Sequence, residues 1–161
     1  MAIDPGEVRS ILNGLIETCK DAQEGFREAA EKLKTGQIST LFLKYSLQRS
    51  EFAGELQAQV TRMGGEPAKS GSTAGAIHRG WIGLKAALTG ASPHAILEEA
   101  ERGEDSAVKN YREALGKDLP SDIHDFVRAQ LVDIQHVHNV VRQLRDGARK
   151  TTSTSGSGQT V

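Results

Sequence analysis

The sequence has little of several residue classes that would mark a specialised protein. It contains one cysteine, Cys19, and only 4% aromatic residues. One cysteine cannot form a disulfide within the chain, which excludes a small disulfide-stapled domain and fits a reducing cytoplasm. No apolar run approaches the roughly 20 residues that span a bilayer. We also expect no signal peptide, because Met1 to Arg9 lacks a basic patch followed by an apolar stretch.

The chain also lacks an excess of charge of either sign. Charged residues make up 25% of the sequence, and the formal net charge is −1. General nucleic-acid binding needs a basic surface that neutralises phosphates, and anionic membranes attract polybasic segments. We therefore expect neither a nucleic-acid partner nor a membrane partner.

What the sequence does contain is typical of helices. Ala, Leu, Glu, Lys, Gln and Arg are abundant, and apolar residues recur at the spacing of one helix face. Asp4-Pro5 and Ser92-Pro93 are typical helix starts, whereas Gly36 and Gly64-Gly65 are typical helix ends. The predicted helices cover residues 5–36, 39–63, 74–88, 92–116 and 120–147.

These helices predict an all-α protein with the architecture of an antiparallel four-helix bundle. Two long hairpins are joined by a connection of about 28 residues that contains the crossover helix 74–88, between the second and third bundle helices. A bundle with one long crossover is the ferritin-like arrangement. We expect residues 1–147 to form this single domain and residues 148–161, rich in Ser, Thr and Gly, to be a disordered tail.

Short motifs from the first hairpin to the last helix carry a family resemblance. They are Phe42, Phe52-Ala53-Gly54-Glu55-Leu56, Gly64-Gly65-Glu66-Pro67, Ser70-Gly71-Ser72, His78-Arg79-Gly80-Trp81, Leu88-Thr89-Gly90, Glu101-Arg102-Gly103-Glu104-Asp105 and Leu144-Arg145-Asp146. Together they resemble an uncharacterised bacterial family of four-helix-bundle proteins, a domain of unknown function near the ferritin-like superfamily. The resemblance covers roughly residues 8–146. It implies the bundle fold and, by analogy, a role in a stress response, but no activity.

The residues do not supply the di-iron site of a ferritin-like oxidase. Such a site needs one glutamate from each of two helices and a Glu-x-x-His pair from each of the other two, all pointing inward. The sequence has no Glu-x-x-His, and its one Asp-x-x-His pair is Asp133 with His136. Helical spacing turns His136 away from the apolar stripe. We therefore predict no complete di-iron motif.

Glu104 is the polar residue that most needs an explanation. It lies near the centre of an apolar stripe, where an unpaired charge costs several kcal/mol. One alternative is a buried polar network that fixes the helix register. A second is a metal ion or small polar ligand held by Glu104, Glu101 and His138, and a third is a second subunit or a water-filled cleft. In the network alternative we expect Glu104→Gln to be tolerated. The candidate network residues are Gln23, Tyr45, Gln48 and Glu55.

Three residues of the crossover helix are candidates for contacts. Trp81 shares a helix face with apolar neighbours, so we expect it to pack this helix onto the bundle. His78 and Arg79 flank that face and are predicted either to contact an anion or the acidic stretch 101–105, or to form surface salt bridges.

The sequence therefore favours a non-enzymatic, ferritin-like bundle that acts by assembly, as a homodimer, or by binding a protein partner. The alternative is a metal-binding ferritin-like protein with a degenerate site for one or two metal ions in the bundle core. Iron, manganese and zinc are the candidate metals for that site, and no other cofactor is expected.

Overall fold

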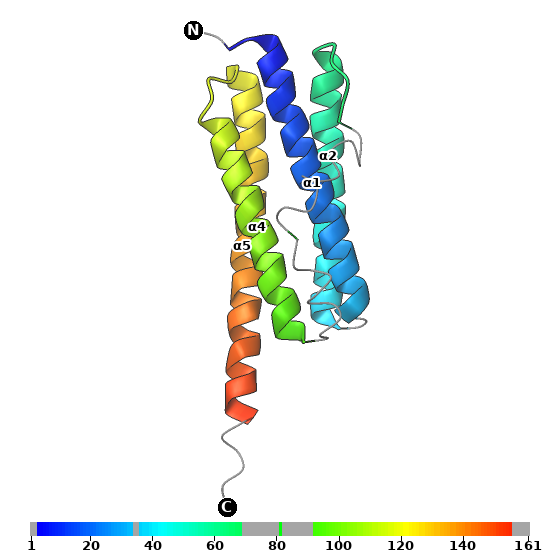
Figure 1. The fold of residues 1–161 in the computed structure, drawn as a ribbon, viewed down its shortest axis with the longest axis vertical. Coiled ribbons are helices and arrows are strands. Elements are labelled where there is room, and N and C mark those ends of the chain that lie inside the picture. Colours follow the sequence, from blue (N-terminus) through cyan, green and yellow to red (C-terminus); the bar gives the residue numbers. More distant parts are fainter. Residues whose placement is uncertain (1–2, 34–35, 69–80, 82–91, 156–161) are drawn as a thin grey trace, which may run out of the picture.

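The computed structural model describes residues 3–33, 36–68, 81 and 92–155. Within them are four helices, α1 (Pro5–Leu33), α2 (Gln37–Arg62), α4 (Pro93–Leu115) and α5 (Ser121–Ser155). They form the predicted all-α four-helix bundle (Figure 1). The predicted crossover helix 74–88 lies outside the described residues except for Trp81, and so do His78 and Arg79.

The helix starts follow the capping signals of the sequence. The Asp4 side chain accepts a hydrogen bond from the Gly6 amide at 3.2 Å, and α1 begins at Pro5. The Ser92 side chain accepts one from the Ala95 amide at 3.4 Å, and α4 begins at Pro93. Both caps satisfy amides that a first helical turn leaves unpaired.

The two hairpins, α1–α2 and α4–α5, lie side by side, and their helices run in two opposite directions. Both α1 and α5 run in one direction, whereas α2 and α4 run in the other (Figure 1). Because α2 and α4 are parallel, α2 ends at the opposite end of the bundle from the start of α4. This is the up-down-down-up course expected for a bundle with one long crossover.

One helix end differs from the prediction. The last helix was expected to end at Gly147, but α5 continues to Ser155 and extends past the ends of the other helices (Figure 1). A glycine costs about 1 kcal/mol inside a helix, which is less than a proline break. Ala148, Arg149 and Lys150, which follow Gly147, are good helix formers. The disorder of the remaining tail stays a prediction.

The apolar core is divided into two clusters along the bundle. One contains Leu12, Cys19, Leu56, Tyr111 and Ile134, among others. The other includes Phe26, Phe42, Trp81, Leu97 and Val141. Every helix contributes to both clusters, and polar side chains lie in the layer between them. None of the helices in the described part of the chain is long and apolar enough to cross a membrane.

Candidate functional site

An ion pair occupies the layer between the two apolar clusters. Both Nη atoms of Arg49 on α2 donate to the Glu104 carboxylate on α4, at 2.7 and 2.6 Å. Both side chains have no solvent exposure. A bidentate pair of this kind uses both carboxylate oxygens, and it binds α2 to α4 at one fixed position along their axes.

The surroundings of Arg49 favour its charged form. Its guanidinium lies 5.7 Å from the centre of the Phe26 ring, and its Nε donates to the Gln48 side chain at 3.3 Å. Burial alone would lower the pKa of Arg49, but the charge and hydrogen bonds of Glu104 outweigh burial and raise that pKa above its ordinary value. The core therefore holds a charged guanidinium at this position.

This pair explains the burial of Glu104, with a partner that the sequence analysis did not name. Arg49 follows Tyr45 by four residues and precedes Phe52 by three, so it falls on the apolar stripe of its own helix. That spacing was a signal for a buried arginine. Tyr45 is buried in the apolar cluster next to this pair, and burial together with the Glu104 charge raises the pKa of its hydroxyl. Gln23 is half-buried, and its backbone carbonyl accepts a hydrogen bond from Ser46.

A second polar chain crosses the bundle about two turns away and contacts all four helices. The Tyr111 hydroxyl donates to Gln130 Oε1 at 2.7 Å. Gln130 Nε2 donates in turn to Glu55 Oε2 at 3.1 Å and to the Phe52 carbonyl at 3.4 Å. Because the Tyr111 proton is used on Gln130, the Cys19 thiol is the donor in its 3.1 Å contact with the Tyr111 oxygen.

Neither Cys19 nor Tyr111 has the properties of a reactive group. Burial raises the pKa of the Cys19 thiol to about 11, although the hydrogen bond with Tyr111 acts in the opposite direction. Burial also raises the pKa of Tyr111 well above its ordinary value. A nucleophilic cysteine needs a lowered pKa and access to solvent. Both side chains therefore serve the structure of the core.

Trp81 lies in a notch made by two glycines. A Cβ atom on Gly25 of α1 would lie 2.7 Å from Trp81 Cε3, and one on Gly103 of α4 would lie 2.8 Å from Trp81 Cδ2. The indole also packs edge-on against Phe26, with ring centroids 5.1 Å apart. Trp81 is 4% exposed. Only glycine at both positions gives the ring room to bury itself between α1 and α4.

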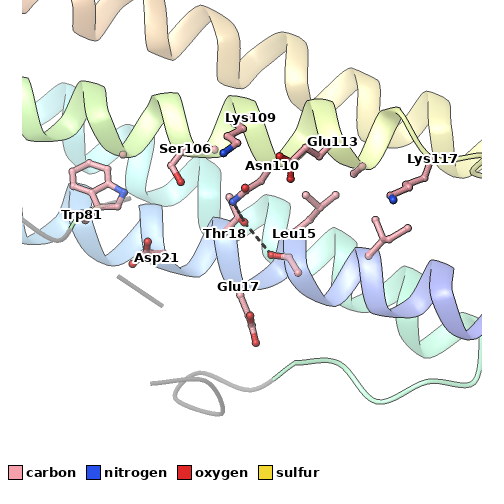
Figure 2. A pocket seen from close by; sticks show the side chains of 15 residues that line it. Leu15, Glu17, Thr18, Asp21, Trp81, Ser106, Lys109, Asn110, Glu113 and Lys117 are labelled. Atoms are coloured by element: carbon pink, nitrogen blue, oxygen red, sulfur yellow. Dashed lines mark hydrogen bonds between the residues drawn. The ribbon is translucent and has the colours of Figure 1, made fainter. Parts of the chain in front are cut away.

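A groove between α1 and α4 begins at Trp81 and has a volume of about 640 Å³ (Figure 2). The Asn110 side chain donates to the Thr18 hydroxyl across it at 3.1 Å. The groove carries both acidic and basic residues, including Glu17 and Lys117. This mixture of charges selects no single ligand chemistry.

Metal-ligating side chains come together between α4 and α5. Glu101, Asp105 and His138 each offer one ligand atom, and these atoms all lie within 4.8 Å of one another. His138 Nε2 is hydrogen-bonded to Asp105 Oδ1. The Glu101 side chain is 12% exposed, His138 18% and Asp105 62%. One carboxylate is thus nearly buried, while another can move in solvent.

Arg145 of α5 is the cation beside this cluster. It forms ion pairs with Glu101 Oε2 and, at 2.9 Å, with Asp146 Oδ1. The hydrogen bond with Asp146, and in smaller part the Glu101 charge, raise the pKa of Arg145. Any other cation at Glu101 would have to compete with this guanidinium.

The structure thus brings together two of the three predicted metal ligands, Glu101 and His138. The third member of the cluster is Asp105, whereas both oxygens of Glu104 are bonded to Arg49. Asp105 follows Glu101 by four residues, one helical turn, which is a signal that sequence alone offered. As predicted, His136 is exposed, and so is Asp133.

Comparison with known proteins adds a family to this geometry. A search of curated proteins finds no match to the sequence. A family model described as a domain of unknown function matches residues 7–117, more than half of the chain. The matched part includes the Arg49–Glu104 pair and the Trp81 notch, whereas His138 and Arg145 follow it. The chain therefore belongs to the family of the domain of unknown function DUF2383.

Proposed function

We propose that this protein is a ferritin-like helical bundle that binds one divalent transition-metal ion between α4 and α5. The observation that carries the proposal is the cluster of Glu101, Asp105 and His138, whose ligand atoms lie within 4.8 Å of one another. The parallel course of α2 and α4 supports the ferritin-like part. The single buried thiol, Cys19, supports a reducing compartment such as the cytoplasm.

The donor set fits a borderline transition metal. One imidazole and two carboxylates suit zinc, manganese or ferrous iron, whereas calcium prefers oxygen ligands alone. Bonds of about 2.1 Å place tetrahedral ligand atoms about 3.4 Å apart, so the cluster must contract slightly around an ion. The exposed Asp105 side chain can make that movement, while the nearly buried Glu101 provides a fixed point.

This site differs from a ferritin-like oxidase centre in place and composition. It lies at the boundary of one helix pair, whereas the core carboxylate Glu104 is neutralised by Arg49. Three protein ligands are enough for one ion with an open coordination position. The function supported here is therefore the binding of a single ion.

We expect protein purified without chelators, and then titrated with Zn²⁺, to bind one ion per chain. His138→Gln and Asp105→Asn each remove a ligand, so each should weaken binding by about tenfold or more. Arg145→Gln should strengthen it, because the ion no longer competes with the guanidinium for Glu101. Calorimetric titration and elemental analysis by mass spectrometry measure both the stoichiometry and the affinity.

His136→Gln is the matched control, since His136 lies two residues before His138 on α5 but is exposed. It should bind zinc as the unaltered chain does. The proposal fails if the unaltered chain binds no ion, or if His138→Gln and His136→Gln have the same affinity. Circular dichroism of each variant shows whether the helices are intact.

A second candidate function, self-association, is favoured by two exposed leucines. Leu43 and Leu47 lie one helical turn apart on α2 and are 51% and 61% exposed. Apolar residues at this spacing form a continuous strip on the helix surface. A second copy of the chain can bury the strip in a symmetric dimer, since two-fold dimers are the commonest assemblies.

Light scattering at increasing concentration tests this second function. We expect twice the chain mass for the unaltered protein and the single-chain mass for Leu47→Lys, because a lysine in the strip carries charge into the contact. Thr61→Lys places the same charge at an exposed position near the end of α2 and should leave the dimer intact. A single-chain mass at every concentration would exclude self-association.

A further inference from the structure

A groove of about 550 Å³ lies against the α4 and α5 residues of the proposed metal site. Asp105 and His138 form part of its wall, so two of the three proposed ligands face the same space. A catalytic-type site with three protein ligands keeps a further coordination position for water or an exogenous ligand. The groove is the accessible space next to that position.

The same wall carries two cations of α4. Lys109 and Arg112 follow Asp105 by four and seven residues, which places all three on one face of the helix. Within the described part of the chain, neither Lys109 nor Arg112 forms an ion pair or a side-chain hydrogen bond. Their charges are therefore available to a ligand.

Amide and acidic groups complete the chemistry of the groove. Gln135 and Asn139 of α5 line it, and their side-chain amides are hydrogen-bond donors. Among the described residues that line the groove, Glu113 is the one carboxylate besides Asp105, and it offsets one of the two cations. A bound divalent ion neutralises Asp105 and Glu101, so the groove with its metal keeps a net positive charge.

We propose that the metal-loaded groove binds a phosphate group, with one oxygen on the metal and others on Arg112 and Lys109. This inference rests on the proposed metal-binding function. The planar fork of an arginine matches two phosphate oxygens, and a divalent ion that faces the same groove adds a third contact. The volume is within the range of small-molecule pockets, so the phosphate can also be part of a small organic monoester.

The test uses the full chain and Co²⁺, whose visible absorption changes when its ligands change. Co²⁺ is added first to establish metal binding, and inorganic phosphate or glycerol phosphate is then titrated into the loaded and the metal-free protein. We expect the spectrum to change and heat to be released only with the loaded protein. The ester binds more tightly if an organic monoester is the ligand, and the two bind equally if free phosphate is.

Variants separate the groove from the metal site. Arg112→Gln should weaken phosphate binding by about tenfold or more while leaving the Co²⁺ affinity unchanged. Arg128→Gln is the control, because Arg128 is exposed on α5 away from the groove lining. Failure of Co²⁺ to bind would overturn the proposed function itself. Three results with the Co²⁺-loaded protein would overturn this inference alone. Phosphate would fail to bind, phosphate would strip the metal from the protein, or phosphate would bind Arg112→Gln as tightly as the unaltered chain.

Discussion

Glu104→Gln is expected to lower the free energy of unfolding by about 3–5 kcal/mol, because it leaves the Arg49 charge buried without a counterion. Both partners are fully buried, and each carboxylate oxygen accepts one hydrogen bond from Arg49. This reverses the expectation from sequence alone, in which a neutral amide at this position was tolerated. Urea denaturation followed by circular dichroism measures the change.

Replacing the whole pair should cost far less than breaking it. Arg49→Met alone leaves a buried carboxylate and should be about as destabilising as Glu104→Gln, whereas Arg49→Met with Glu104→Leu should be nearly neutral. Glu31→Gln removes an exposed ion pair with Arg27 and serves as the control, with no measurable change expected because solvent screens this pair. Equal losses from the single and double variants would show that packing, and not charge, dominates at this position.

Trp81→Ala is expected to lower the free energy of unfolding by about 3–5 kcal/mol, the usual cost of truncating a buried large aromatic side chain. Trp81 is buried between α1 and α4, and its ring packs against Phe26. Its loss removes the contacts of the indole ring with α1 and α4. Trp81 is the only tryptophan, so its replacement removes the tryptophan fluorescence of the protein. Thermal unfolding is therefore followed by circular dichroism for all variants.

The glycine notch explains why Trp81 fits, and it can be tested separately. Gly25→Ala and Gly103→Ala each force the ring away, which should cost roughly 1–3 kcal/mol despite alanine's higher helix propensity. Gly14→Ala and Gly54→Ala are matched controls within α1 and α2, because an added Cβ meets no atom there within 4 Å. These controls should gain about 0.5–1 kcal/mol.

A double variant shows whether the two effects have one cause. In the Trp81→Ala background the clash is gone, so Gly25→Ala should become neutral or stabilising. A Gly25→Ala loss that persists without the indole would instead assign the cost to the backbone of α1. Non-additivity of this kind is expected for groups in direct contact.

The fold could be predicted from local signals, whereas the site depended on contacts between helices. Asp4-Pro5 and Ser92-Pro93 mark helix starts through interactions within a few residues, so sequence was sufficient for them. The Arg49–Glu104 pair joins residues 55 positions apart. To predict this pair, one must know how α2 and α4 are turned about their axes relative to each other. The spacing of residues within each helix does not give that orientation.

The candidate metal site shows the same division. Glu101 and His138 were predicted as ligands of one metal site, and the structure places them in one cluster. Asp105 was missed because it is exposed on α4, with 62% of its side chain accessible. The predicted ligand Glu104 lies at the centre of the apolar stripe, whereas the ligating atoms meet at its edge.

The division of the core into two apolar clusters has a consequence for cooperativity. The boundary crosses all four helices, so it does not separate one hairpin from the other. Opening either hairpin would expose parts of both clusters and separate Arg49 from Glu104 in the same event. Partial unfolding of one hairpin therefore loses contacts in both clusters and the buried ion pair. The bundle should open as a single unit, and its slowest-exchanging amides should be found in all four helices.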